Sequence, residues 1–195
     1  LSVPLPKDFR LQGKLCELRL EFAKVAFVVE LPDDQQTEPT EIAAGDLGVN
    51  TMIAATNGEK TVLISGREAK AIVQYRNKML AGVSEAQLKR VKGSRRWKRL
   101  QKRKRHMLAK TRRKLKDISH KATRIVANEF PNAKIYVGKP FNDAARKVGR
   151  RTAQTVAQAM NGRIINYLGY KCHSVEVIDE HYTSQTCPVC GERQK

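Results

Sequence analysis

Residues 42–64 read IAAGDLGVNTMIAATNGEKTVLI, and this stretch decides the fold. It contains three short apolar runs, at residues 42–46, 51–55 and 61–64, each with the length of a β-strand. Asn57-Gly58 lies between the last two runs and is a strong signal for a tight hairpin turn. We therefore predict three antiparallel strands here.

The chain after these runs changes to a helical pattern from Arg67, and no proline occurs before Pro131. Apolar residues at a spacing of three or four indicate one long helix of roughly 50 Å. We expect Gly82 and Gly93 to separate this helix from a preceding one. The predicted apolar stripe consists of Trp97, Leu100, Leu108, Thr111, Leu115, Ile118, Ala122 and Ile125.

Two strands and a helix complete the predicted order. Residues 133–138 form a buried strand, 151–168 a helix that Gly169 ends, and 175–178 a further strand. Strands linked through helices in this order predict a mixed α/β sheet with parallel crossovers.

The first forty residues have a different, β-rich pattern. Cys16, Leu18, Leu20 and Phe22 alternate with polar residues, as in a half-buried strand, and residues 25–31 form a second strand. Residues 33–40 are a linker or long turn. Because the chain starts at Leu1 without a signal-peptide pattern, we expect an interior cut of a longer protein.

Positive charge is concentrated in one segment. The 195 residues have a net charge of +19, yet residues 89–124 hold 18 Lys or Arg and one acid, Asp117. Such a segment repels itself unless a polyanion neutralises it, which favours nucleic acid over an anionic membrane surface, since apolar anchors are sparse. The 41% hydrophobic content excludes general disorder, and no apolar run is long enough to span a membrane.

The cations of this segment are predicted to contact phosphates and to position a duplex without reading its sequence. A second cluster follows residue 138 and either holds a bound strand or merely precedes a helix; it comprises Lys139, Arg146, Lys147, Arg150 and Arg151. The predicted nucleic-acid-binding residues are Arg95, Arg96, Lys98, Arg99, Lys102, Arg103, Lys104, Arg105, Arg112 and Arg113.

Asp46 ends the first predicted strand between Gly45 and Gly48, which allow close approach by a phosphate or a metal ion. An Asp-X-Gly triplet is most often a simple turn. Beside a polybasic element it becomes a candidate Mg²⁺ ligand, because Mg²⁺ takes carboxylate oxygens and two such ions can clamp a phosphodiester.

Cys187-Pro188-Val189-Cys190-Gly191 has the spacing of a zinc-ribbon knuckle. A thioredoxin-like redox pair is the alternative, although such a pair normally precedes a helix. A closed zinc site needs four ligands, and we expect a second cysteine pair beyond Lys195, because His173 and His181 fit poorly. Cys16 and Cys172 are interpreted as core residues, which argues against a disulfide framework.

Four features together resemble the transposon-encoded TnpB/OrfB proteins and their eukaryotic Fanzor relatives. These features are the run from Asp46 to Asn50, the basic helix, the strand at residues 135–137, and the string YTSQTCPVCG at residues 182–191. The resemblance covers about residues 41–195. Residues 1–40 are similar, less specifically, to the end of the wedge-like β-barrel that precedes the nuclease domain in that family.

The resemblance implies an RNA-guided DNA endonuclease that acts with two Mg²⁺ ions, a guide RNA and target double-stranded DNA, without a membrane partner. It implies a RuvC domain with an RNase H-like fold at 41–181, including basic helices at 67–129. Residues 182–195 would be the first half of a zinc ribbon, with Cys187 and Cys190 as Zn²⁺ ligands. We expect the bacterial cytoplasm as its location, or the nucleus if the host is eukaryotic.

The sequence departs from the family's active site at one position. Asp46 matches the first acid, but Gly138 stands where a Glu is usual, and the third acid would lie beyond Lys195. Either the nuclease is inactive and binds DNA only, or another acid replaces the missing one. We predict the second case, with Asp46 and Glu180 as catalytic Mg²⁺ ligands and Asp179 and Glu176 as the next candidates for the role of Glu180. A DNA transposase is the third reading.

Overall fold

The computed structural model describes residues 10, 13–21, 24–30, 38–139, 149–179, 187, 190 and 192. The chain divides into two compact units, Leu1–Glu38 and Pro39–Lys195, and each is described here by itself.

The first unit contains one antiparallel hairpin, formed by β1 (Lys14–Glu21) and β2 (Lys24–Glu30). Both predicted strands are therefore confirmed. The predicted burial is wrong, because Cys16, Leu18 and Leu20 are all exposed. A two-stranded ribbon buries little surface unless a second layer covers it, and the described part of this unit has no such layer.

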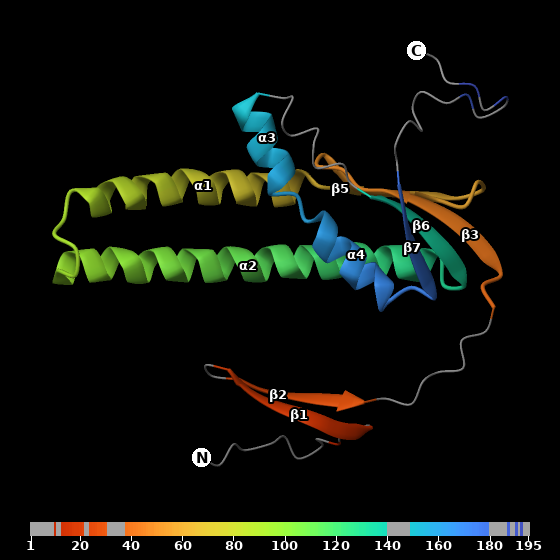
Figure 1. Cartoon of the computed structure of the whole chain (residues 1–195), viewed down its shortest axis with the longest axis horizontal. Helices are drawn as coiled ribbons and strands as arrows, with labels where there is room; N and C mark the ends of the chain where they lie inside the picture. Colours follow the sequence, from red (N-terminus) through yellow and green to blue (C-terminus); the bar gives the residue numbers. More distant parts are fainter. Residues whose placement is uncertain are drawn as a thin grey trace. The chain divides into compact units, whose positions relative to one another are not determined.

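The second unit is built on a five-stranded sheet with the strand order β5-β4-β3-β6-β7 (Figure 1). The three strands at one side are antiparallel, whereas β6 and β7 run parallel to β3, so the predicted mixed α/β sheet is confirmed. The strands are β3 (Glu41–Asp46), β4 (Thr51–Thr56), β5 (Thr61–Ser65), β6 (Ala133–Lys139) and β7 (Ser174–Asp179).

Two long helices, α1 (Arg67–Leu88) and α2 (Arg95–Glu129), form a helical hairpin between β5 and β6. Gly93 lies in the turn between them with a φ of +84°. Gly82 was expected to break the chain, but it lies inside α1. A single glycine costs a helix only about 1 kcal/mol, and the buried Val83 beside it favours continuing the helix.

The predicted helix over 151–168 is two helices, α3 (Arg150–Ala157) and α4 (Asn161–Gly169). Asn77 of α1 donates a hydrogen bond from its amide nitrogen to Gln158 Oε1 at 2.8 Å, which fixes the break to α1. α4 instead contacts α2 and buries Ile164 and Leu168. At this break Gln158 is therefore held to α1, whereas α4 packs against α2.

The core lies between one face of the sheet and the second half of α2. Ile53, Ile135 and Val137 of the sheet are buried with Val126 and Phe130. Alternate residues of β3 and β4 supply this face, as expected for a period of two.

The buried face of α2 differs from the predicted stripe, because Leu108 and Ile125 are exposed. Ser119 and Thr123 are fully buried instead, since their hydroxyls donate to the carbonyls of Leu115 at 2.8 Å and Ser119 at 2.9 Å. Such bonds satisfy a hydroxyl within its own helix, so a small polar residue can occupy the core. The buried residues of α2 are Thr111, Leu115, Ser119, Ala122, Thr123 and Val126.

No helix in the described part of the chain combines the length and apolar character that crossing a membrane requires.

We expect Phe130→Ala to lower the free energy of unfolding by about 3–5 kcal/mol, because it empties a fully buried position between α2 and the sheet. Leu63→Ala is the control, since Leu63 is exposed on β5 and its truncation should change little. Urea unfolding followed by circular dichroism measures both, and equal midpoints would contradict the assigned core.

Candidate functional site

Asp46 is exposed at the carboxyl end of β3, in the middle of the sheet. Gly45 pairs with Val137 in parallel register, and Gly138 pairs with Ile178, so Asp46, Gly138 and Ile178 follow one another across three strands. All three line a hollow of about 290 Å³ on the sheet face opposite the α2 core. Gly138, which has no side chain, lines this hollow together with Asp46.

The loop that follows Asp46 is held against the start of α1. Gly66 N–H donates to the Asn50 carbonyl at 2.7 Å, and Lys70 Nζ donates to Asn50 Oδ1 at 2.9 Å. Gly66 has an ordinary φ of −94°, but an added Cβ would collide with the carbonyl oxygen of Val49. Glycine is therefore required here for close approach of two backbones, and the contact fixes the loop beside Asp46.

The other three acids predicted near this site, Glu180, Asp179 and Glu176, differ in what the structure shows of them. Glu180 lies outside the described residues, so its position stays a prediction. Asp179 ends β7 and pairs in register with Lys139. Glu176 lies opposite Tyr136, away from the strand end, and forms an ion pair with Lys134 at 2.7 Å. Among the described residues, no group of three potential metal ligands converges.

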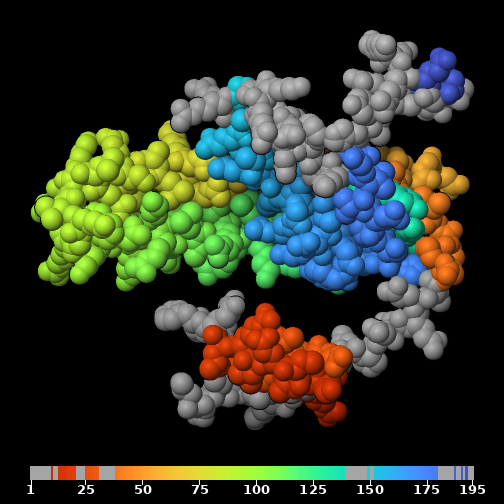
Figure 2. Space-filling view, viewed as in Figure 1, coloured from red at the N-terminus to blue at the C-terminus, as the bar shows by residue number. Residues whose placement is uncertain are grey.

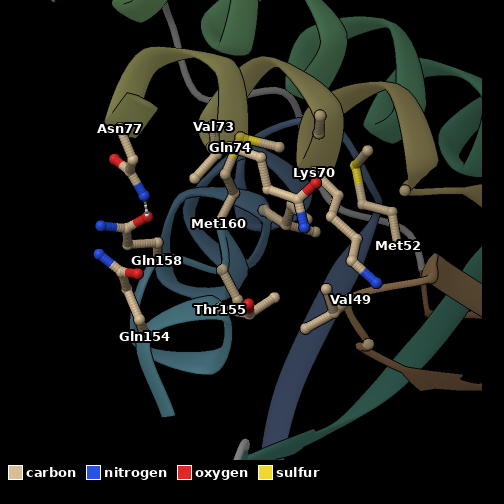
Figure 3. Close-up of a pocket in the computed structure, with 15 residues that line it drawn as sticks. Val49, Met52, Lys70, Val73, Gln74, Asn77, Gln154, Thr155, Gln158 and Met160 are labelled. Atoms are coloured by element: carbon tan, nitrogen blue, oxygen red, sulfur yellow. Dashed lines mark hydrogen bonds between the residues drawn. The ribbon is translucent and has the colours of Figure 1, made fainter. Parts of the chain in front are cut away.

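A second cavity, of about 280 Å³, begins two residues after Asp46 (Figure 3). Its inner surface is apolar, with Met52, Val73 and Met160, and its rim carries amides and a cation. Lys70 and Gln74 of α1 lie across from Gln154, Thr155 and Gln158, which belong to α3 or follow it. The cavity thus combines an apolar wall with hydrogen-bonding groups next to the loop of Asp46.

The ten predicted nucleic-acid-binding residues all lie on α2, and nine are exposed while Lys104 is half-buried. None of them has an acidic partner within the described ranges. The acids of this region are already engaged, since Glu85 pairs with Lys89 and Asp117 with Lys121. Ser94 caps the helix by accepting a hydrogen bond from Trp97 N–H at 3.3 Å.

The outer part of the α1–α2 hairpin projects beyond the sheet and the other helices in the view of Figure 2. The cations from Arg95 to Arg105 belong to this part, whereas the buried residues of α2 begin at Thr111. The hairpin therefore presents an uncompensated positive surface to solvent.

The second predicted cationic cluster is only partly described. Lys139 ends β6, while Arg150 and Arg151 form the first turn of α3. Arg146 and Lys147 lie outside the described residues. Contact of this cluster with a bound strand stays a prediction.

The cysteines divide into two kinds. Cys187 N–H donates to the Glu192 carbonyl at 2.9 Å, and Cys190 is exposed. Two thiols at this spacing along the chain suit a zinc knuckle, although two further ligands would be needed. Cys172 is buried, as predicted, and burial raises the pKa of its thiol to about 11.

The contacts of Gly66 and Lys70 with Asn50, called the loop clamp below, were not identified from the sequence. Gly66 directly precedes the predicted helix, and Asn50 ends the loop after Asp46, but nothing local indicates that they meet. Lys70 lies twenty residues from Asn50 along the chain.

Comparison with known proteins gives two matches to sequence families. Residues 26–157 match OrfB of IS605, described as a probable transposase, and residues 162–195 match the Cas12f1-like TNB domain. A search of curated proteins gives no match.

Two solved structures share the fold. A cryo-EM structure of a Cas12f1–sgRNA–target DNA complex is 17% identical with a TM-score of 0.60, over 87% of this chain and 35% of that one. A CRISPR-Cas12f ternary complex is 18% identical with a TM-score of 0.50, over 86% and 34%. The chain thus spans about a third of the length of these proteins.

We expect Gly66→Ala to lower the free energy of unfolding by about 1–3 kcal/mol, because the new methyl group would force the backbone at Val49 away from α1. Gly82→Ala is the control: Gly82 lies inside α1, the helix that Gly66 precedes, and has open space around it, so alanine should stabilise by about 0.5–1 kcal/mol. Thermal unfolding of both variants measures the difference, and equal shifts would contradict the loop clamp.

Proposed function

The chain belongs to the TnpB/OrfB family, and on this premise we propose that it forms the nuclease part of an RNA-guided DNA endonuclease. The observation that carries the proposal is Asp46, exposed at the end of the central strand β3 and level with the ends of the two strands that run parallel to it, β6 and β7. Ligands of open α/β sheets bind outside the carboxyl ends of the strands, which supports this edge as the active site. The strand order and mixed direction suit an RNase H-like domain.

The proposed partners are a guide RNA and a target DNA. The matched Cas12f1 structure contains an sgRNA and target DNA, and it resembles this chain in fold. The independent support is the exposed row of cations on α2, which has no acidic partners within the described residues. Guide pairing would supply sequence recognition, and these cations would hold the backbone of the duplex.

Mg²⁺ would be held by Asp46 together with acids that the described residues do not include. Bound there, such ions polarise the phosphodiester and activate a water molecule. The contribution of the described residues is positional: the contacts of Gly66 and Lys70 with Asn50 fix the loop after Asp46. The hollow that Gly138 lines would admit a carboxylate from a neighbouring strand.

Glu180 is our candidate for that carboxylate, on the basis of strand alternation. Ile178 lines the hollow with Asp46, so a side chain two residues later would return to the same face if the strand direction continued. Asp179 would point to the opposite face. Glu176 shares the face but is paired with Lys134 below the strand end.

The alternative is a guided DNA-binding protein without nuclease activity, and the specific observation in its favour is Gly138. In that case the hollow beside Asp46 would lack a second acid. A transposase is a third candidate, which the description of the matched family favours. Cys187 and Cys190 are proposed to bind Zn²⁺ with two ligands from elsewhere.

We expect Asp46→Asn to reduce DNA cutting by about 100-fold or more while binding of guide and target is retained. Loss of a metal ligand removes several kcal/mol of transition-state stabilisation, whereas the amide keeps the size of the side chain. The measurement is plasmid cleavage in Mg²⁺ by the complete protein with its guide RNA. Wild-type cleavage by Asp46→Asn would exclude the proposed site.

The same assay separates the two glutamates. Glu180→Gln should reduce cutting to a similar extent. Glu176→Gln should leave cutting within a few-fold of the wild-type rate, because the exposed ion pair that it removes is worth at most about 1 kcal/mol. If the wild-type protein binds target DNA and never cuts it, the inactive binder replaces our proposal. Joining of DNA ends would instead favour the transposase.

We expect Lys102→Ala combined with Arg103→Ala to weaken duplex binding and to flatten its dependence on salt. Each phosphate contact contributes about 0.9 to the slope of log K against log salt, so two lost contacts should reduce the slope by nearly 2. Lys78→Ala, at an exposed cation of α1, is the control. An unchanged slope in the double variant would contradict the interface on α2.

A further inference from the structure

A cluster of aromatic rings joins α2 to the end of α4, away from the ten cations described above. The His120 ring stacks on Tyr167 with centroids 4.0 Å apart and an interplanar angle of 15°. Tyr170 meets Tyr167 edge to face at 5.7 Å, and its hydroxyl lies 3.2 Å from His120 Nδ1. All three rings are therefore held by contacts within the cluster, while Tyr170 remains 61% exposed.

Lys171 anchors this arrangement. Its ammonium group donates to the His120 carbonyl at 2.7 Å and to Thr123 Oγ1 at 2.8 Å, which ties the end of α4 to α2. The same group lies 5.8 Å from the centre of the Tyr167 ring and 5.9 Å from that of Tyr170. These contacts hold the backbone next to Tyr170 in place. The Tyr170 ring is therefore presented to solvent from an anchored turn.

The surroundings of the rings are strongly positive. Lys121 and Arg124 line a hollow of about 550 Å³ together with His120, Tyr170 and Lys171. Burial and the charges of Lys171, Lys116 and Arg163 lower the pKa of His120, against the opposing charge of Asp117. Asp117 is itself paired with Lys121 at 2.8 Å. Cations therefore outnumber acids here, and the lowered pKa of His120 favours its neutral ring.

We propose that this patch, formed by His120, Lys121, Arg124, Tyr167, Tyr170 and Lys171, binds unpaired nucleotides of a nucleic acid. A base would stack on the exposed ring of Tyr170, and the adjoining phosphate would meet Lys121 and Arg124. Exposed aromatic rings set among cations are the usual means of holding single strands, because every base has a flat face to stack. A duplex offers no free base to the ring.

The position of the patch separates it from the cutting chemistry. Tyr170 and Lys171 precede β7, whose first residue is Ser174, whereas Asp46 lies level with the end of that strand. A six-residue strand is about 20 Å long, so nucleotides on the patch are not those cut at Asp46. Along α2, Lys121 is also about 12 Å beyond Arg113. The patch is therefore a separate holding surface.

This inference rests on the proposed function in one respect, namely that the chain handles nucleic acid. Two sources of unpaired nucleotides are then available, a single-stranded part of the guide RNA and the DNA strand displaced by the guide. Both present a base and a phosphate, so the patch chemistry is the same for each. The experiment below distinguishes them.

The test measures binding of short labelled oligo(U) RNA, oligo(dT) DNA and a DNA duplex by fluorescence anisotropy. We expect Tyr170→Ala to weaken single-strand binding by about 5-fold to 100-fold and to leave duplex binding within 2-fold. Tyr170→Phe keeps the ring and should bind like wild type. Tyr75→Ala is the matched control, because Tyr75 is 65% exposed on α1 and has no ring contact in the described part of the chain.

Oligonucleotides with 5-iodouracil provide a local readout, and we expect their photo-crosslink to map to Tyr170. Weaker binding of oligo(U) alone assigns the patch to the guide RNA, and weaker binding of oligo(dT) alone assigns it to the displaced DNA strand. Weaker binding of both single strands also supports the proposal. The proposal is overturned if Tyr170→Ala binds both single strands like wild type, or if an oligo-glutamate peptide competes as well as oligo(U). Cutting by the complete protein reports on Asp46 separately, and thermal unfolding shows whether Tyr170→Ala is folded.

Discussion

The parallel pairing of β3 with β6 is the constraint on which the rest of the second unit depends. It joins residues about ninety positions apart, from Glu41 opposite Ala133 to Gly45 opposite Val137. Because parallel strands cannot be joined by a tight turn, the intervening chain must leave the sheet and return. β4 and β5 extend the sheet on one side, and the α1–α2 hairpin connects β5 to β6. The same pairing brings the end of β3 beside Gly138, so the candidate site is a direct result of the topology.

The strands were predictable because their signals are local. Each apolar run has a length and a turn signal that need no knowledge of the rest of the chain, and every predicted strand of the sheet lies within one residue of an observed one. The details that sequence missed depend on contacts across the fold. Which face of α2 is buried follows from the position of Val126 and Phe130 over the sheet. The break between α3 and α4 follows from the contact of Gln158 with Asn77, which is eighty-one residues away.

The candidate site also combines a feature with a local sequence signal and features that depend on contacts across the fold. Asp46 was a candidate from the sequence, because its carboxylate lies between two glycines at a predicted strand end in a chain that also carries a polybasic element. The residues that fix its loop were not, since the Lys70–Asn50 bond and the close approach of Gly66 arise only when α1 docks on the sheet. The aromatic patch was hidden for a similar reason. Tyr170 and His120 are fifty residues apart, and nothing near either one in sequence indicates that they meet.

α2 combines two electrostatic roles along one helix. Its second half is anchored by a buried face without charges, while its first half carries cations that repel one another in the absence of acidic partners. That repulsion would disfavour an isolated helix, so the packing of Leu115, Ala122 and Val126 must hold the helix together as a whole. A bound polyanion removes the repulsion, and any ligand that binds only the folded state stabilises it. Nucleic acid is therefore expected to act on this protein both as a partner and as a source of stability, with the largest effect on the exposed end of the hairpin.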